Sequence, residues 1–232
     1  MTSYKEDIYG LALKEFYEHQ KPFYLKLHNN YGKPEKMPIE VFFREDQDLS
    51  ELEQLAIEEC SGSVLDIGAG TGVHALILQD IGLDVTAVDI SPAAVEVMEM
   101  SGVNKAIQND VRHIRNEKFD TLLLLMNGLG IAGKLEELPN YLITFKNLLK
   151  PGGKIVLDSS DVSYLQNPVN SNSYVGEIEY QYEHKGEKGK PFNWLYVDKQ
   201  TLENEAMKLG LSFEIIYEDE NDQYLAVLQI AK

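Results

Sequence analysis

The sequence is poor in cysteine and in basic side chains. Its single cysteine, Cys60, excludes an internal disulfide and suits a reducing compartment, so we expect a cytoplasmic protein. Lys and Arg together number 21 against 38 Asp and Glu, which gives a formal net charge of −17. Such a charge repels phosphate backbones and anionic lipid surfaces, so we expect neither nucleic acid nor a membrane as a partner.

Long apolar runs and metal-binding patterns are also absent. The longest apolar run, Leu122 to Met126, is far too short to cross a bilayer, and no basic stretch followed by an apolar core stands at the N-terminus. We therefore expect no membrane span and no signal peptide. The five histidines include no pair at i and i+4 and have no cysteine nearby, so we expect no metal site.

What the sequence does contain is a glycine-rich turn between an apolar run and a helical pattern. Residues 64–67, Val-Leu-Asp-Ile, are typical of a strand that is buried on both faces. Residues 68–72 then carry glycine at every second position, and a helical pattern follows from His74. Glycine reaches backbone angles that a Cβ disfavours and lets the chain lie close against a ligand. This order predicts the first half of a nucleotide-binding βαβ unit.

An acidic residue after the next expected strand indicates which ligand binds. Asp89 follows the strand 84–88 and lies 21 positions after Gly68. A carboxylate at that distance can accept hydrogen bonds from the two ribose hydroxyls of an adenosine. The pattern therefore predicts an adenosine site; the alternative is a tight turn and a solvent-facing Asp in a protein that binds nothing.

Three motifs resemble those of the class I S-adenosylmethionine-dependent methyltransferases. They are VLDIGAGTG at 64–72, AVDIS at 87–91 and LLKPGGKIVLD at 148–158. The resemblance implies S-adenosylmethionine as the cofactor. It also implies an α/β fold with a Rossmann-like, seven-stranded, mostly parallel sheet whose last strand is antiparallel. Helices are expected on both faces, with an N-terminal helical cap and a β-hairpin insertion.

The resemblance also assigns cofactor contacts to this sequence. Asp110 matches the acidic residue that meets the adenine amino group, with Val111 beside it, although a surface ion pair is the alternative. Arg44 is a candidate for the cofactor's carboxylate, because a guanidinium can hold a carboxylate with two N–H groups, or else it is a surface residue packed beside a helix. The remaining candidates lie in the glycine turn and in the loops that follow the expected strands: Asp66, Gly68, Ala69, Gly70, Gly72, Asp89, Ile90 and Asn127.

We expect an N-terminal cap over residues 1–60 and a cofactor-binding domain over 61–232. Ser3 and Glu6 match a capping box for a helix over 3–20, and Ser50 and Glu53 match one for a second helix. Residues 23–40 are expected to be a loop because they include Pro34 and Pro38. The cap offers residues that can close over the cofactor: Tyr9, Tyr17, Phe23, Tyr24 and Arg44.

An insertion over 160–198 is expected to contain a β-hairpin with an aromatic face. Tyr180 and Tyr182 alternate with polar residues, and Phe192, Trp194 and Tyr196 follow the turn. This face either walls an acceptor site or packs against the domain or a second copy in a homodimer. The strands near 213–217 and 224–230 are too close in sequence for a parallel crossover, so they must be antiparallel.

The chemistry is less determined than the cofactor. Asn127-Gly128 departs from the Asn/Asp-Pro-Pro-aromatic pattern of many amino-group methyltransferases, which argues against methylation of a base or of glutamine. Asp158 and Asp161 are candidates for a general base, but no catalytic residue can be named. We expect a methyltransferase acting on a small-molecule acceptor. The alternatives are a non-catalytic, S-adenosylmethionine-binding regulatory protein and a nicotinamide oxidoreductase, and the glycine spacing argues against the latter.

Overall fold

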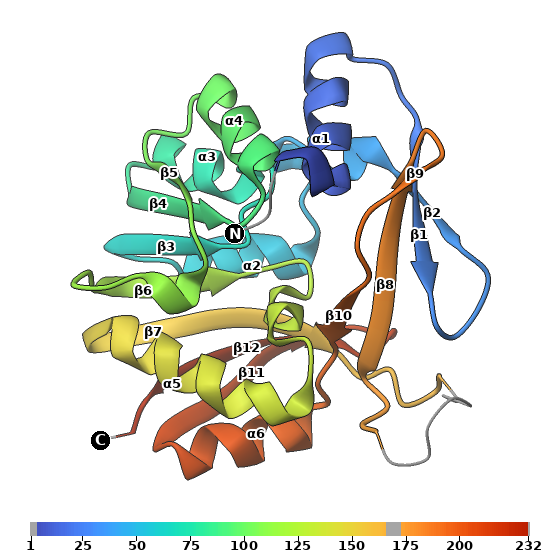
Figure 1. Ribbon diagram of the computed structural model, residues 1–232. Coiled ribbons are helices and arrows are strands. Elements are labelled where there is room, and N and C mark those ends of the chain that lie inside the picture. Colours follow the sequence, from blue (N-terminus) through green and yellow to red (C-terminus); the bar gives the residue numbers. More distant parts are fainter. Residues whose placement is uncertain (1–3, 166–172, 232) are drawn as a thin grey trace.

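The computed structural model describes residues 4–165 and 173–231, which build two sheets (Figure 1). The main sheet has seven strands in the order β11-β12-β7-β6-β3-β4-β5. The pairs from β7 to β5 are parallel, and β12 is antiparallel to both of its neighbours, which confirms the expected fold class. Its strands are β3 (Ser63–Ile67), β4 (Asp84–Asp89), β5 (Ala106–Gln108), β6 (Phe119–Leu124), β7 (Leu149–Ser160), β11 (Leu211–Glu218) and β12 (Gln223–Ile230).

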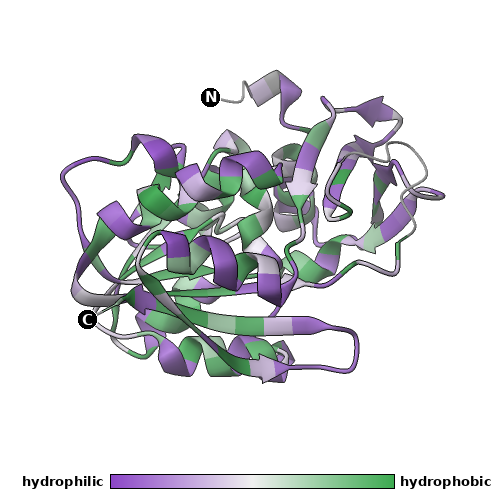
Figure 2. Ribbon diagram, turned by 90° about the horizontal axis from the view of Figure 1, so that it is seen from below, coloured by the Kyte–Doolittle hydropathy of each residue, from purple (hydrophilic) through white to green (hydrophobic). Residues whose placement is uncertain are grey.

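The central strands are apolar on both faces, because helices cover both sides of the sheet. Leu122 and Leu124 of β6 point into one core and Leu123 into the other. The first core lies under α5 (Leu138–Leu148) and α6 (Lys199–Lys208), and the second under α2, α3 and α4. Figure 2 shows the apolar strands inside and polar residues on the outer surfaces of the helices.

The helices of the second face begin where the sequence predicts. The second predicted helix is α2 (Glu51–Glu59), and its capping box between Ser50 and Glu53 is confirmed. Ser91 caps α4 (Pro92–Ser101), with proline at the first helical position. Between them, α3 (Val73–Asp80) directly follows the glycine turn.

A second, antiparallel sheet joins two segments that lie far apart in the sequence. Its order is β10-β8-β1-β2, with β9 also paired to β8 (Figure 1). The predicted hairpin is confirmed, with Tyr180 opposite Phe192, but the expectation of a loop over 23–40 was wrong. This segment pairs with β8, where Leu27 lies opposite Tyr182. The strands are β1 (Tyr24–Asn29), β2 (Glu35–Pro38), β8 (Glu177–His184), β9 (Glu187–Lys188) and β10 (Phe192–Leu195).

The first helix also begins later than predicted. Helix α1 spans Ile8–His19 and is capped by Asp7, whereas Ser3 lies outside the described residues and Glu6 lies in a preceding 3-10 turn. Ala12 and Leu13 of α1 pack against the face of α4 that points away from the main sheet. The cap segment therefore contains α1, the strands β1 and β2, and α2, and its boundary at residue 60 stays a prediction.

Candidate active site

The turn between β3 and α3 leaves open space in front of its backbone. Gly68 and Gly70 have φ angles of +74° and +58°, which a side chain rarely adopts. Gly68 N and Ala69 N donate to Val88 O at 2.9 and 3.2 Å and tie the turn to β4. Within the described chain, no heavy atom lies within 4 Å of an ideal Cβ placed on Gly68. The backbone at Gly68 is thus free for close approach by a ligand.

The third glycine has a different physical cause. A Cβ on Gly72 would lie 2.7 Å from Val103 Cγ2 and 3.0 Å from Met98 Cγ, on α4 and just after it. Gly72 also has a φ of +83° and is the N-cap of α3. Helix packing and backbone conformation account for this glycine, and its part in ligand binding stays a prediction.

Asp66 is a buried carboxylate with an unused oxygen. Its side chain lies at the end of β3 beneath the turn, and its Oδ2 has no hydrogen-bond partner among the described residues. Burial raises the pKa of Asp66 to about 6. A buried acceptor without a donor is costly, so this oxygen is suited to a donor that arrives with a ligand.

Asp89 ends β4 on the other side of the turn. Its Oδ2 accepts from Gly70 N at 2.9 Å and its Oδ1 accepts from Ser91 N at 2.8 Å. Burial raises the pKa of Asp89 to about 6, and these two backbone donors oppose the rise. Each oxygen keeps a further lone pair, and the neighbouring Ile90 is 54% exposed although it is apolar. The carboxylate and an apolar surface therefore lie next to each other at this strand end.

The adenine candidate Asp110 already has a cationic partner. The Arg112 guanidinium donates to Asp110 Oδ2 at 2.6 Å and holds the pKa of Asp110 below its usual range. Arg112 also lies over the Tyr141 ring, while Val111 is buried. The surface ion pair is present, and a contact from Asp110 or Val111 to adenine stays a prediction.

The loop after β6 is held in an unusual conformation. Met126 and Asn127 both have left-handed backbones, with φ angles of 60° and 56°. Asp158 holds them in place, because Asn127 N donates to its two oxygens at 2.8 and 2.9 Å. Gln223 Nε2 donates to the same carboxylate at 2.8 Å. Left-handed conformations cost roughly 1–3 kcal/mol each and concentrate at functional sites.

These contacts give Asp158 a different part to play, and its service as a general base stays a prediction. The side chain is fully buried, and burial raises its pKa to about 6 while donors from Asn127, Gln223 and Gly128 surround it. Asp158 is therefore a positioning residue for the loop. Asp161 lies three residues further along the chain and accepts from Ser163 N at 2.8 Å.

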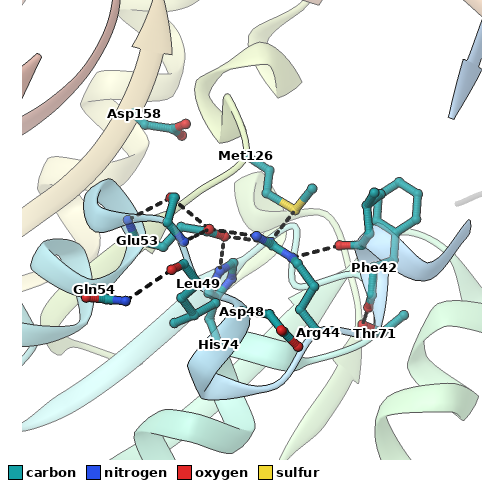
Figure 3. A network of polar contacts seen from close by, with 12 residues as sticks. Phe42, Arg44, Asp48, Leu49, Glu53, Gln54, Thr71, His74, Met126 and Asp158 are labelled. Atoms are coloured by element: carbon teal, nitrogen blue, oxygen red, sulfur yellow. Dashed lines mark hydrogen bonds and ion pairs between the residues drawn. The ribbon is translucent and has the colours of Figure 1, made fainter. Parts of the chain in front are cut away.

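Arg44 lies at the β6 side of the turn and has a carboxylate partner from this chain. Its guanidinium donates to both oxygens of Glu53, and its Nη2 contacts Met126 Sδ at 3.6 Å (Figure 3). Burial alone would raise the pKa of Glu53, but donors from His74 and Arg44 outweigh it and hold that pKa far below its usual range. A contact from Arg44 to the cofactor stays a prediction.

Of the aromatic residues expected to close the site, Tyr9 lies over the glycine turn. Its hydroxyl is 3.1 Å from the position of a Cβ on Gly70. Tyr17 instead donates to Met100 O, Phe23 packs on His184, and Tyr24 is 61% exposed.

Tyr9 belongs to an aromatic row that crosses from the cap to the second sheet. Its ring centroid lies 5.3 Å from that of Phe42 and 5.1 Å from that of Tyr182, and Tyr182 stacks on Phe192 at 5.2 Å. We call Phe42, Tyr9, Tyr182 and Phe192 the aromatic row.

Two further contacts that position Tyr9 were not predicted. Asp7 Oδ2 accepts from Ser91 Oγ at 2.6 Å and from Ala93 N at 3.2 Å, so the start of α1 is fixed to the start of α4. Gly10 permits this approach, because a Cβ there would lie 2.2 Å from Ser91 Oγ. An Asp three residues before a glycine is the only local sequence signal, and it does not identify the distant partner.

Neither a metal cluster nor a membrane helix is present in the described part of the chain. No group of three His, Cys, Asp or Glu side chains there is placed to hold an ion. Among the same residues, no helix combines the length and apolarity needed to cross a bilayer.

Known proteins match both the central segment and the whole fold. A family model described as "Methyltransferase domain" matches residues 65–157. The cypemycin N-terminal methyltransferase of a Streptomyces species is 32% identical over 108 residues, which are 45% of this chain and 44% of that protein. A ubiquinone biosynthesis O-methyltransferase of Xanthomonas oryzae is 30% identical over 103 residues, 41% of this chain and 42% of that protein. The chain thus spans less than half the length of these curated relatives.

One solved structure resembles the chain throughout. It is a SAM-dependent methyltransferase from Bacteroides fragilis in complex with S-adenosyl-L-homocysteine, with 39% sequence identity and a TM-score of 0.92. The similarity covers 100% of this chain and 98% of that one. On this full-length likeness and on the matching domain model, the chain belongs to the S-adenosylmethionine-dependent methyltransferases.

Proposed function

We propose that this protein transfers the methyl group of S-adenosylmethionine to a small-molecule acceptor. The observation that carries the proposal is the open backbone at Gly68, which has the Asp89 carboxylate on one side and the unpaired Asp66 oxygen below it. An adenosine needs an acceptor pair for its ribose hydroxyls, and the cofactor's ammonium group needs an anionic acceptor. Both requirements are met within one turn.

The remaining residues of the site fit the same ligand. Ile90 offers apolar surface for the adenine, and Asp110 with Val111 stands at the end of the next strand. Ala69 and Gly70 continue the close-approach backbone, with Tyr9 above it. Arg44 and Asn127 lie at the β6 side, where we place the amino-acid end of the cofactor.

The acceptor site is proposed to lie between the β6 loop and the second sheet. Bound S-adenosylmethionine supplies an activated methyl group, so the chain mainly has to align the acceptor and exclude water. The loop of Met126 and Asn127 is fixed by Asp158, and Trp194 of β10 packs directly on Gly130 behind it. Together with the aromatic row, these residues give a rigid wall of aromatic rings that suits a small acceptor with an apolar part.

The cellular setting is proposed from composition. A single cysteine suits a cytoplasmic location, and the net charge of −17 disfavours nucleic acid as the acceptor. A homodimer is a further proposal for which the second sheet offers edge strands. The two curated relatives are named for N-terminal and O-methylation, so they support methyl transfer without selecting an acceptor atom.

Release of S-adenosylhomocysteine from S-adenosylmethionine tests the proposed activity. The protein is incubated with panels of small amines, phenols and carboxylic acids, and product is measured by a coupled assay. Turnover with at least one acceptor class supports the proposal. Tight cofactor binding with no turnover of any acceptor in any panel would contradict the proposal. That result would favour a regulatory protein that binds the cofactor without transferring its methyl group.

A further inference from the structure

A buried polar cluster lies behind the β6 side of the site, and two of its members, Glu53 and His74, have no part in the function described so far. It joins Glu53 of α2, His74 in the first turn of α3 and Arg44 from the cap segment (Figure 3). The side chains of Glu53 and His74 are 7% and 9% exposed. A buried charge is costly unless it is paired and hydrogen-bonded. The partners of each group in the cluster therefore indicate its role.

The Glu53 carboxylate is saturated with donors. Its Oε2 accepts from Ser50 N at 3.0 Å, Ser50 Oγ at 2.9 Å and Arg44 Nη1 at 2.7 Å. Its Oε1 accepts from Arg44 Nη2 at 2.5 Å and faces His74 Nε2 at 3.0 Å. Because the carboxylate is ionised and only accepts, the His74 Nε2 must carry the proton of that contact. Glu53 is thereby held from the start of its own helix, from α3 and from Arg44 in the segment before α2.

This arrangement fixes one edge of the Arg44 guanidinium, and at the second edge, made of Nε and Nη2, Nη2 lies beside Met126 of the β6 loop. Its Nε donates to Val41 O at 2.9 Å, and its Nη2 also contacts Met126 Sδ at 3.6 Å. A thioether is a weak acceptor. Within the described chain, Nε of this second edge thus has a strong acceptor, whereas the Nη2 N–H that faces Met126 has only the thioether, although the side chain is already immobilised. Thr71 Oγ1 donates to Phe42 O and ties this stretch of the cap to the glycine turn.

Sheet order explains why a ligand would reach this edge. Asp89 ends β4, and Met126 follows β6, with β3 between them. Neighbouring strands are about 4.8 Å apart, so the two positions are separated by roughly 10 Å. An adenosyl ligand whose ribose is bound at Asp89 and which crosses the turn at Gly68 has its amino-acid end near Arg44.

We propose that Glu53, supported by His74, is a positioning residue that presents Arg44 to the carboxylate of the cofactor. The inference rests on the proposed function. An arginine that is free in solution loses rotamer freedom when it binds, whereas this guanidinium is ordered before the ligand arrives. The charges of Glu53 and Arg44 cancel, so the pair has no net positive charge to attract the cofactor's carboxylate. Recognition would instead come from an N–H donor of Arg44 that is held in a fixed direction.

Two ligands separate this role from a general effect on the site. S-adenosylhomocysteine carries the carboxylate, whereas S-adenosyl-3-thiopropylamine is the same molecule without it. Titration calorimetry of both ligands with Glu53→Gln should show S-adenosylhomocysteine weakened by at least about tenfold, because the amide faces Arg44 with its own N–H groups. The decarboxylated ligand should change by less than about twofold. Glu58→Gln, the same substitution at an exposed site of the same helix, should change neither.

Arg44→Lys provides an independent variant that leaves the helix cap at Ser50 intact. It keeps the charge but loses the second donor edge, so it should reproduce the selective loss, and the double variant should be no weaker than Arg44→Lys alone. Equal weakening of both ligands, additive effects or no effect would overturn the inference. Equal binding of both ligands by the unaltered protein would also overturn it while leaving the adenosine site intact. If the unaltered protein bound neither ligand, the proposed function itself would fail.

Discussion

At the scale of single residues, glycine has two different purposes within one turn. Gly68 faces open space, whereas Gly72 is packed against Met98 and Val103. The sequence shows both glycines but cannot separate these purposes, because Met98 and Val103, the neighbours of Gly72, lie about 30 positions away on α4 and just after it. The same holds for the carboxylates, since Asp89 accepts from backbone donors of the glycine turn and of the start of α4, whereas Asp158 accepts from the β6 loop and from Gln223.

Alanine substitutions should separate the two glycines. Both variants force an alanine into the left-handed region, at a cost of about 1–2 kcal/mol each. Gly72→Ala adds a clash with Val103 and should lose a further 1–3 kcal/mol or so of unfolding free energy. Gly68→Ala should be the more stable variant in urea yet bind S-adenosylhomocysteine at least about tenfold more weakly, because its methyl group projects into the ligand space. The reverse ranking in either measurement would contradict this assignment.

At the scale of secondary-structure elements, the cap is built by long-range pairing that the sequence shows only in part. The alternation of Leu25 and Leu27 in β1 fits a half-buried strand, but its partner β8 lies some 150 residues away, and prolines mark the segment as a loop. Helix α1 begins at Ile8, where Asp7 caps it and also accepts from Ser91 and Ala93, so the start of this helix is tied to α4 by a contact that the local pattern does not show. The motif-bearing strands and helices were predictable because their signals are local.

Removal of the Asp7 contacts should release α1 from α4. Asp7→Ala deletes a helix cap, which costs about 1 kcal/mol, and leaves the Ser91 hydroxyl without this acceptor. Amide hydrogen exchange should accelerate across α1, while β3 and β6 keep their protection. Asp198→Ala removes the cap of α6 on the opposite face of the sheet and should accelerate exchange there alone. Unchanged protection of α1 in Asp7→Ala would show that this contact does not fix the helix.

At the scale of the whole molecule, three buried carboxylates gather where the parallel strands end. Burial raises the pKa values of Asp66, Asp89 and Asp158 to about 6. An acid with a raised folded pKa contributes stability that is complete below its unfolded pKa, near 4, and is lost as the pH rises through the folded value. The protein is thus destabilised at neutral pH by these three buried carboxylates.

Unfolding in urea should therefore show greater stability at pH 5.5 than at pH 7.5. As the pH falls from 7.5 to 5.5, the three carboxylates bind protons in the folded state but not in the unfolded state. This difference should raise the free energy of unfolding by on the order of 2 kcal/mol in total. Glu53 has the opposite effect on stability, because its pKa is lowered in the folded state. Its contribution to the free energy of unfolding is lost only at more acidic pH, outside this range. Asp66→Asn should remove about a third of the pH dependence. A stability that rises from pH 5.5 to pH 7.5 would contradict the assigned shifts.

The most direct test of the account is calorimetric titration of S-adenosylhomocysteine into the protein and into Asp89→Ala. Two hydrogen bonds from ribose to an ionised carboxylate are lost, and each is worth about 1.5–3 kcal/mol, so affinity should fall by at least tenfold or so. Asp84→Ala, at the exposed start of the same strand, should bind like the unaltered protein. A folded Asp89→Ala protein with undiminished affinity would contradict the placement of the adenosyl group at this edge of the sheet.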